Sequence, residues 1–211
     1  TSLRKYLAYD NVPSPRTMIA GVHKLAPGHL LVWERGQIVR EEQWWDLPHP
    51  TATLTRERDA ARTLWESIRS GVRARLVSDV PLGVFLSGGL DSTAVATAAA
   101  ELTDASQLDT FCIGFDDPSF DESAHAEAVA IHLGTRHHTR RLSSGDLLDL
   151  LPEIIGTLDE PLADPSLVPT HLLSRFAREQ VTVALGGDGG DELLMGYPTF
   201  GAHGPASLAA R

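Results

Sequence analysis

Segments of strand character alternate with helix-like stretches over most of the chain. Four such segments, mostly short and apolar, predict strands at 81–86, 110–115, 136–142 and 181–185. Between and around them, helical spacing predicts helices over 92–102, 121–133, 145–157 and 168–179. Strands that alternate with helices indicate parallel βαβ units, so the pattern predicts an α/β fold with a doubly wound parallel sheet.

The first fifty residues have a different pattern. Strand-forming residues at 29–34 and 37–45 flank Arg35-Gly36, a plausible two-residue turn, and predict a β-hairpin. A proline-containing linker follows near 48–51. We therefore expect one domain, or its last part, at 1–50 and a second one at 55–211.

A long helix is expected at 56–77, directly after the linker. Thr55 is a good N-cap for it. Its predicted apolar face consists of Ala61, Leu64, Ile68, Val72 and Leu76.

Composition excludes several protein classes. The 211 residues are 42% hydrophobic and 22% charged, which is ordinary for a globular protein and excludes a disordered or fibrous chain. The lone cysteine, Cys112, excludes a disulfide framework and a cysteine-based zinc site, and it fits a reducing compartment. No apolar run approaches the roughly 18 residues that a membrane span requires. We therefore expect a soluble, cytoplasmic protein.

The net charge of −10 is distributed unevenly. Residues 116–211 contain 6 basic and 15 acidic residues, whereas residues 1–50 contain 6 and 5. Such an acidic chain is unsuited to non-specific nucleic-acid binding, which requires a basic face. Most of these carboxylates are expected to be solvated, although an acidic half also suits divalent cations.

The strongest chemical signal is Ser87-Gly88-Gly89-Leu90-Asp91-Ser92, between a predicted strand and a predicted helix. Glycines let the backbone approach a ligand, and the helix N-terminus with the two serine hydroxyls can hold an anion. Asp91 would repel a phosphate unless a cation lay between them, which indicates magnesium on a polyphosphate. The alternative is an ordinary turn in which Asp91 or Ser92 caps the helix. Neither a Walker A nor a Rossmann motif is present.

A second glycine-rich segment, 186–192 (GGDGGDE), follows the last predicted strand. Its four glycines and three carboxylates predict a loop rather than a regular element. Loops at the carboxyl ends of strands that flank a switch point converge on the ligand. If the first and fourth strands are neighbours, Asp91 and Asp191 can share one metal ion.

Three segments together carry a family resemblance: SGGLDS, GGDGGDELLMGYP and FCIGFDDPSFDESAHAEAVAIHLGTRHH. They resemble the synthetase domain of glutamine-dependent asparagine synthetases, which has the PP-loop ATP-pyrophosphatase fold. Upstream, 23–29 (HKLAPGH) and the hairpin resemble the end of the family's glutaminase domain. By this resemblance the chain is a piece of a longer enzyme, truncated at both ends.

The resemblance implies an ATP-dependent amide-forming ligase. Aspartate would be adenylated, and ammonia from glutamine would give asparagine, AMP and pyrophosphate. Related enzymes adenylate other acceptors, as β-lactam synthetases and lasso-peptide cyclases do, and a nucleotide-binding fragment without full activity is a further alternative. The expected partners are thus small molecules (ATP, an aspartate-like carboxylate and ammonia), and neither nucleic acid nor a membrane is expected. A homodimer is a further expectation for the full-length protein.

The resemblance also implies roles for individual residues. The β,γ-pyrophosphate and magnesium would be held by Ser87, Gly88, Gly89, Asp91 and Ser92, with Asp191 as the second metal ligand. Phe85 and Ile113 occupy positions whose backbone contacts adenine, and Gly186 and Gly187 also lie at the nucleotide. Asp188 fills a position that is usually glutamate; there it would take a proton from the attacking ammonia, or else only cap the next helix or bond within its loop.

Several residues depart from the family or favour structural roles. The glutaminase nucleophile is an N-terminal cysteine, whereas this chain begins with Thr1, and Cys112 lies in an apolar strand and is expected to be inert. Gly186 stands where serine is common, and a lysine of the family's later helices has no counterpart. His137 and His138 should point to opposite faces of a strand, and His125 and His132 to one face of a helix.

Overall fold

The computed structural model describes residues 1–48 and 56–201. The chain forms two compact units. The first comprises Thr1–Thr55 and Leu150–Val168, and the second comprises Arg56–Asp149 and Pro169–Arg211. The pairing of residues 150–168 with the N-terminal stretch is a feature that the sequence pattern does not reveal.

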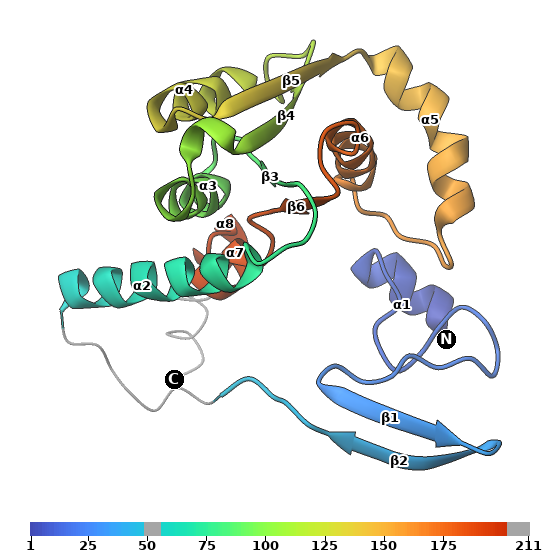
Figure 1. Ribbon diagram of the computed structural model, residues 1–211. Helices are drawn as coiled ribbons and strands as arrows, with labels where there is room; N and C mark the ends of the chain where they lie inside the picture. The colour runs from blue at the N-terminus through green and yellow to red at the C-terminus, as the bar shows by residue number, and fades with distance from the viewer. Residues whose placement is uncertain (49–55, 202–211) are drawn as a thin grey trace. The chain divides into compact units, whose positions relative to one another are not determined.

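A four-stranded parallel sheet in the order β5–β4–β3–β6 forms the centre of the second unit (Figure 1). The strands are Leu82–Phe85 (β3), Asp109–Phe115 (β4), Arg136–Leu142 (β5) and Val183–Leu185 (β6). Each lies within two residues of its predicted range, and all three strand pairings are parallel. The predicted α/β fold with a parallel sheet is confirmed.

Helices cover both faces of this sheet (Figure 1). α3 (Leu90–Leu102) and α4 (Ser123–Leu133) pack on one face. α6 (Leu167–Ala177) lies on the other face, where Phe176 meets Phe111 edge-on with ring centroids 5.7 Å apart. The sheet is therefore doubly wound, as predicted.

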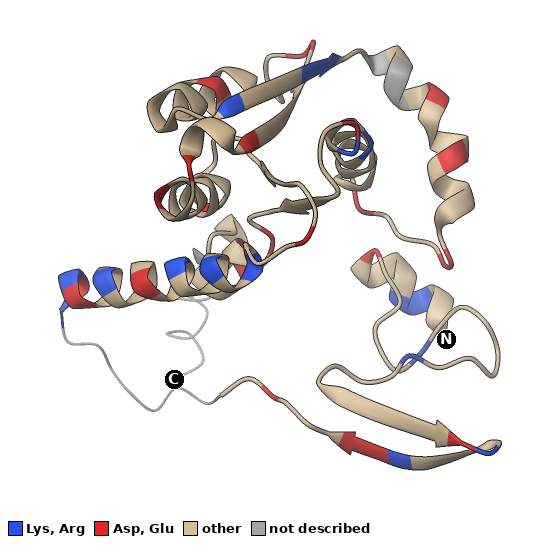
Figure 2. Ribbon diagram, viewed as in Figure 1, with Lys and Arg blue, Asp and Glu red and all other residues tan. Residues whose placement is uncertain are grey.

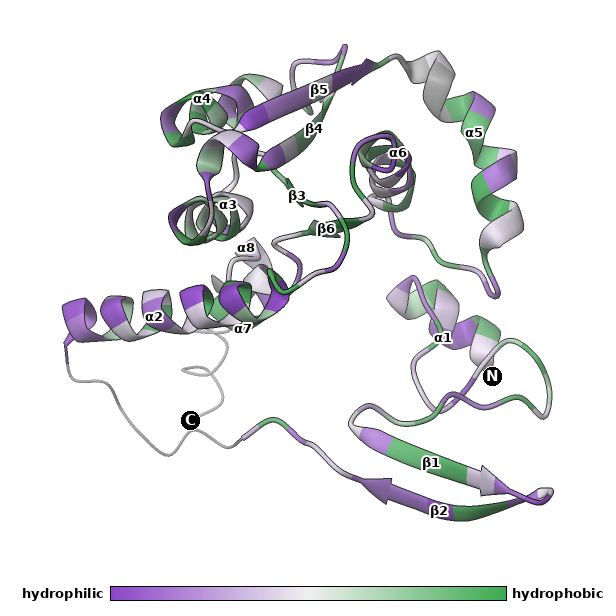
Figure 3. Ribbon diagram, viewed as in Figure 1, coloured by the Kyte–Doolittle hydropathy of each residue, from purple (hydrophilic) through white to green (hydrophobic). Residues whose placement is uncertain are grey.

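Small side chains let α3 and α4 approach the sheet closely. Fully buried alanines on these helices share one core with Val84 of β3 and Cys112 of β4: Ala96, Ala98, Ala99, Ala126 and Ala130. β3 and β6 are hydrophobic, whereas β5, at one edge of the sheet, is polar (Figure 3). Arginines near both ends of β5 suit an edge strand, because charge there discourages pairing with another chain (Figure 2).

The long helix α2 (Glu57–Arg75) packs on the core only through its C-terminal half. The residues in contact are Trp65, Ile68, Val72 and Leu76. Leu64, which is 41% exposed, and Ala61 lie off this face, so the predicted apolar face is wrong in its first half. Charged residues surround this exposed half (Figure 2). The predicted cap, Thr55, lies outside the described residues.

The first unit contains the predicted hairpin, with β1 at His29–Glu34 and β2 at Gln37–Gln43. Arg35 and Gly36 both have positive φ, 50° and 87°, as a two-residue hairpin turn requires. A helix that the sequence analysis did not predict, α1, spans Ser2–Tyr9. The assignment of residues 1–50 to a glutaminase domain stays a prediction.

Residues 150–168 pack with the N-terminal stretch through buried side chains and polar contacts. Val12 and Ile154 are each 1% exposed. Lys24 donates a 2.6 Å hydrogen bond to the Val12 carbonyl and forms an ion pair with Glu160. The Ala163 N–H donates to the Asp10 carbonyl at 2.9 Å.

The remaining elements are α5 (Ser144–Thr157), the 3₁₀ turn Ala105–Gln107, α7 (Gly190–Leu194) and α8 (Pro198–Gly201). α7 corrects the expectation that residues 186–192 contain no regular element. Gly189 adopts φ 86° at its N-cap, and Asp191 and Glu192 lie in its first turn, where carboxylates stabilise a helix. No described helix is long and apolar enough to span a membrane.

Candidate functional site

The two glycine-rich segments meet at a topological switch point of the sheet. β3 lies between β4 and β6, and it pairs in parallel with both. The next two strands along the chain, β4 and β5, lie on one side of β3. The last strand, β6, lies on the other side of β3. The loops after β3 and β6 therefore extend from the same edge of the sheet, which is where ligands bind in open α/β sheets.

The loop after β3 is held in shape by its own hydroxyls. The Ser87 and Ser92 oxygens lie 3.0 Å apart, and the Gly89 N–H donates to the Ser87 hydroxyl at 3.2 Å. Ser92 in turn donates to the Gly89 carbonyl at 3.2 Å. Gly88 has φ 85°, a conformation that glycine adopts without strain.

Helix α3 begins directly in this loop. Gly89, rather than Asp91 or Ser92, is its N-cap residue, and no side chain caps the helix. The alternative that Asp91 or Ser92 serves as the cap is therefore excluded. Among the described residues, the N–H groups of Gly88, Leu90 and Asp91 find no hydrogen-bond acceptor. These unused donors, at the positive end of a 13-residue helix, favour an anion.

The loop after β6 packs directly against the first loop. A β-carbon on Gly187 would lie 2.9 Å from the Ser92 nitrogen and 3.0 Å from the Asp91 β-carbon. A β-carbon on Gly190 would lie 2.5 Å from Asp91 Oδ2. At Gly187 the neighbouring atoms are main-chain atoms and a β-carbon, so this approach requires glycine there, whereas at Gly190 the neighbour is the Asp91 carboxylate. The fold thus brings together two segments that are about a hundred residues apart in sequence.

The carboxylates suit a magnesium ion in their chemistry. Asp91 lies against Gly190, and Asp191 is the next residue along the chain, with its carboxylate beside Gly196. Carboxylate and hydroxyl oxygens are the ligands that magnesium accepts, usually one or two carboxylates together with substrate phosphates. No group of three or more potential ligands occurs in the described parts of the chain, so the protein alone offers no complete metal cage there.

Asp188 folds back over its own loop. One of its carboxylate oxygens lies where a β-carbon on Gly186 would stand, so the small residue at 186 makes room for it. The side chain is exposed, and Gly189, not Asp188, is the N-cap of α7. Within the described residues its carboxylate accepts no hydrogen bond, so neither structural alternative, capping the helix or bonding within the loop, is present.

The two predicted adenine-contacting positions lie at the same edge of the sheet. Phe85 is the last residue of β3, and Ile113 lies in the second half of β4 and is 8% exposed. One contact of this edge escaped the sequence analysis. A β-carbon on Gly88 would come within 2.6 Å of the His125 β-carbon, so the first turn of α4 packs on the loop after β3.

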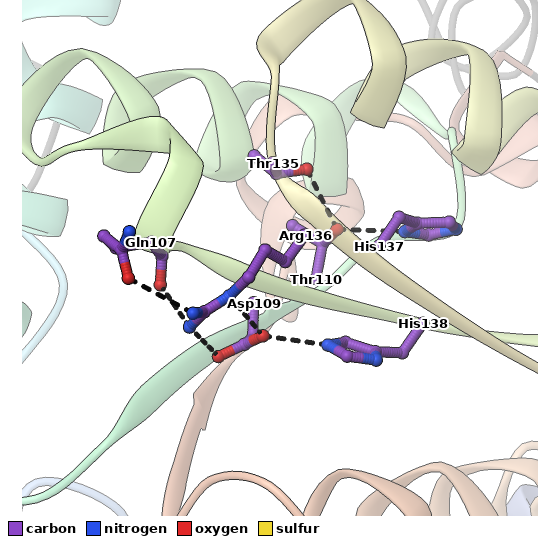
Figure 4. Close-up of polar contacts among 7 residues, drawn as sticks. All are labelled: Gln107, Asp109, Thr110, Thr135, Arg136, His137 and His138. Atoms are coloured by element: carbon purple, nitrogen blue, oxygen red, sulfur yellow. Dashed lines mark hydrogen bonds and ion pairs between the residues drawn. The ribbon is translucent and has the colours of Figure 1, made fainter.

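A polar cluster occupies the opposite edge, where β4 and β5 begin (Figure 4). Arg136 donates two hydrogen bonds to Asp109, at 3.1 and 2.7 Å, and two more to Gln107. His138 contacts Asp109 at 2.8 Å and stacks on Phe111. Burial raises the pKa of Asp109, but the hydrogen bonds and charges of Arg136 and His138 outweigh it and hold the pKa below its ordinary value. The cluster fastens the two strands together.

His137 points to the other face of β5, as predicted. Its Nδ1 lies 2.9 Å from the Thr110 hydroxyl, which also contacts Thr135 at 3.1 Å (Figure 4). Burial lowers the pKa of His137, although Glu127 opposes the shift. Cys112 is also buried, and burial raises its pKa to about 11, which is consistent with the expectation that its thiol is unreactive.

Comparison with known proteins identifies the family. The family model described as asparagine synthase matches residues 63–209, more than two thirds of the chain. This chain belongs to the asparagine synthase family. The matched range contains both glycine-rich loops.

Curated relatives carry the same family name. A putative asparagine synthetase [glutamine-hydrolyzing] 2 of Methanocaldococcus jannaschii is 35% identical over 92% of this chain and 38% of its own length. Asparagine synthetase [glutamine-hydrolyzing] 1 of Bacillus subtilis is 34% identical over 94% of this chain and 31% of its own. The chain thus spans about a third of the length of these relatives.

Among solved structures, an NH3-dependent NAD synthetase from Campylobacter jejuni aligns with a TM-score of 0.44 and 17% identity. The alignment covers 64% of this chain and 60% of that one. This likeness concerns the fold alone and adds nothing to the assignment of function.

Proposed function

We propose that this protein is the nucleotide-binding part of an ATP-dependent amide-forming ligase that converts aspartate to asparagine. One observation carries the proposal: Gly187 and Gly190 pack on Asp91 at the switch point, directly beside the unused N–H groups of the loop after β3. Membership of the asparagine synthase family supports the reaction class.

In this proposal, two groups of backbone positions contact different parts of the nucleotide. Backbone N–H groups of Gly88, Leu90 and Asp91 bind the β,γ-phosphates of ATP, and the serine hydroxyls keep the loop in shape. The backbone at Phe85, Ile113, Gly186 and Gly187 contacts the rest of the nucleotide.

Asp91 and Asp191 would hold one magnesium ion. When bound, the ion neutralises charge that develops on the leaving pyrophosphate. The protein's own contribution is a set of N–H donors at the start of α3, which would stabilise the same charge without reorganisation.

The reaction proceeds in two steps. A carboxylate oxygen of the acceptor attacks the α-phosphorus, and the bond to the β,γ-pyrophosphate breaks, which leaves an acyl-adenylate. The ammonia nitrogen then attacks the acyl carbon, and the carbon–oxygen bond to AMP breaks. Asp188, which is exposed and accepts no hydrogen bond within the described part of the chain, takes the proton that ammonia releases. We assign the supply of ammonia to a glutaminase domain of which residues 1–50 are the last part.

Exchange of labelled pyrophosphate into ATP tests the first step. The full-length protein should catalyse this exchange only when a carboxylic acid is present, and aspartate should be the best among a panel of amino and β-amino acids. Exchange with another acid would retain the adenylation chemistry and assign a different acceptor. Release of ADP and orthophosphate would refute the mechanism.

A further inference from the structure

We propose that His125 contacts the β,γ-phosphates of the nucleotide and contributes to the preference for ATP over AMP. The inference rests on the function proposed above and adds one residue to its site. His125 is not in either glycine-rich loop, and it follows β4 rather than β3 or β6.

Packing places His125 at the loop. A β-carbon on Gly88 would lie 2.6 Å from the His125 β-carbon, 2.7 Å from the Ala126 nitrogen and 2.8 Å from the His125 carbonyl carbon. The first turn of α4 therefore rests on the loop after β3, at the residue whose N–H is an unused donor. Ala126 is fully buried in this contact region, whereas His125 is exposed and can extend toward a ligand.

The acidic residues of the two loops make a further hydrogen-bond donor useful at this edge of the sheet. The second loop contributes Asp188, Asp191 and Glu192, and the first contributes Asp91, so a bound triphosphate meets an acidic surrounding. Neither glycine-rich loop contains a lysine or an arginine. An imidazole N–H donor from His125 therefore adds a side-chain interaction with phosphate that the carboxylates of the loops cannot make.

Two acidic residues also stand at the start of α4, and one of them is already paired. Asp121 is paired with Arg141 at 2.9 Å and also accepts a hydrogen bond from the Ser123 N–H. Glu122, the N-cap residue of α4, makes no side-chain capping bond. His125 follows it by one turn and lies on the side of the helix that faces Gly88.

The helix supplies a matched control. His132 is also exposed and stands seven residues further along α4, so it lies near the same face. It is about 10 Å further along the helix axis, at about 1.5 Å per residue. Its replacement changes the same chemistry on the same helix without reaching the loop.

Calorimetric titration with ATP and with AMP, both with magnesium, tests the proposal on the full-length protein. His125→Ala should weaken ATP binding about tenfold and leave AMP binding unchanged, because AMP lacks the β,γ-phosphates. His125→Lys should restore most of the ATP affinity, and His132→Ala should match the unaltered protein. Circular dichroism verifies that each variant is folded, and His125→Gln serves as a second replacement.

Unchanged ATP affinity in His125→Ala would overturn this inference and leave the proposed function standing. Equal losses of ATP and AMP binding, or a similar loss in His132→Ala, would also overturn it, since both indicate a structural effect. If the unaltered protein binds no ATP, the proposed function fails together with the inference.

Discussion

Replacing Gly187 with alanine tests the contact on which the site depends. The added β-carbon would lie 2.9 Å from the Ser92 nitrogen, 3.0 Å from the Asp91 carbonyl carbon and 3.0 Å from the Asp91 β-carbon. Ordinary contacts are about 3.5–4.0 Å, so the two loops must separate by roughly 0.5–1 Å. None of the three atoms can rotate away, because two belong to the main chain and the third is fixed to it.

The expected cost follows from this overlap. Overpacking at a position that cannot yield costs about 1–3 kcal/mol of unfolding free energy. Gly187 has no left-handed backbone conformation, so the expected loss comes from the steric overlap and not from backbone strain. Displacement of a binding loop by about 1 Å should lower the affinity for ATP by at least about tenfold.

Urea denaturation followed by circular dichroism measures the stability, and calorimetry measures ATP binding. Gly156→Ala is the control, because a β-carbon at this position in helix α5 would meet no other atom within 4 Å. That variant should bind ATP normally and gain about 0.5–1 kcal/mol. A Gly187→Ala protein with unaltered stability and affinity would refute the packing of the two loops.

Three further predictions concern single side chains. The pKa of Asp109 is lowered in the folded state, so the Asp109 carboxylate stabilises the fold at pH values above its ordinary pKa of about 4, and this stabilisation is lost as the pH falls further. Asp109→Asn should therefore be less stable near neutral pH, and its unfolding free energy in urea melts should fall less steeply with acid. An unchanged dependence on acid pH would contradict this. Cys112, with a pKa of about 11, should resist a thiol reagent at pH 8 until the protein is unfolded; rapid labelling of the native protein would show that the thiol is accessible. Asp188→Asn should retain pyrophosphate exchange while amide formation falls by on the order of 10²-fold, and equal losses in both steps would mark a structural or nucleotide-site residue.

Elements with a strong local signal were predicted from the sequence. The β1–β2 turn is one example, since Arg35-Gly36 accepts the positive φ angles that a tight hairpin needs. The end of α4 is another, because Gly134 adopts a left-handed conformation directly after Leu133, where the predicted helix also ends. The alternation of strands and helices was enough to identify the parallel sheet.

Features that depend on tertiary contact were not visible in the sequence. The apolar face of α2 shifted from Leu64 to Trp65, because contact with the core is confined to its C-terminal half. The short helix α7 formed in a glycine-rich segment, where Gly189 supplies a left-handed N-cap. Such outcomes depend on the surrounding packing, which local patterns do not encode.

The candidate site also combines features that the sequence predicts with a tertiary contact that it does not. Both glycine-rich loops could be found from the sequence, and the adjacency of β3 and β6 fulfils the condition on which a shared metal depends. The contact of His125 with Gly88 could not be found, because it joins residues 37 positions apart through the packing of a helix on a loop.

A double-mutant cycle on Asp91 and Asp191 tests the central claim, that the two loops form one nucleotide site with one magnesium ion. ATP affinity is measured by calorimetry for Asp91→Asn, Asp191→Asn and the double variant, each with and without magnesium. We predict that each single variant loses most of the magnesium-dependent affinity, that the double variant loses little more, and that metal-free binding changes less. Additive losses that are the same with and without magnesium would contradict the claim.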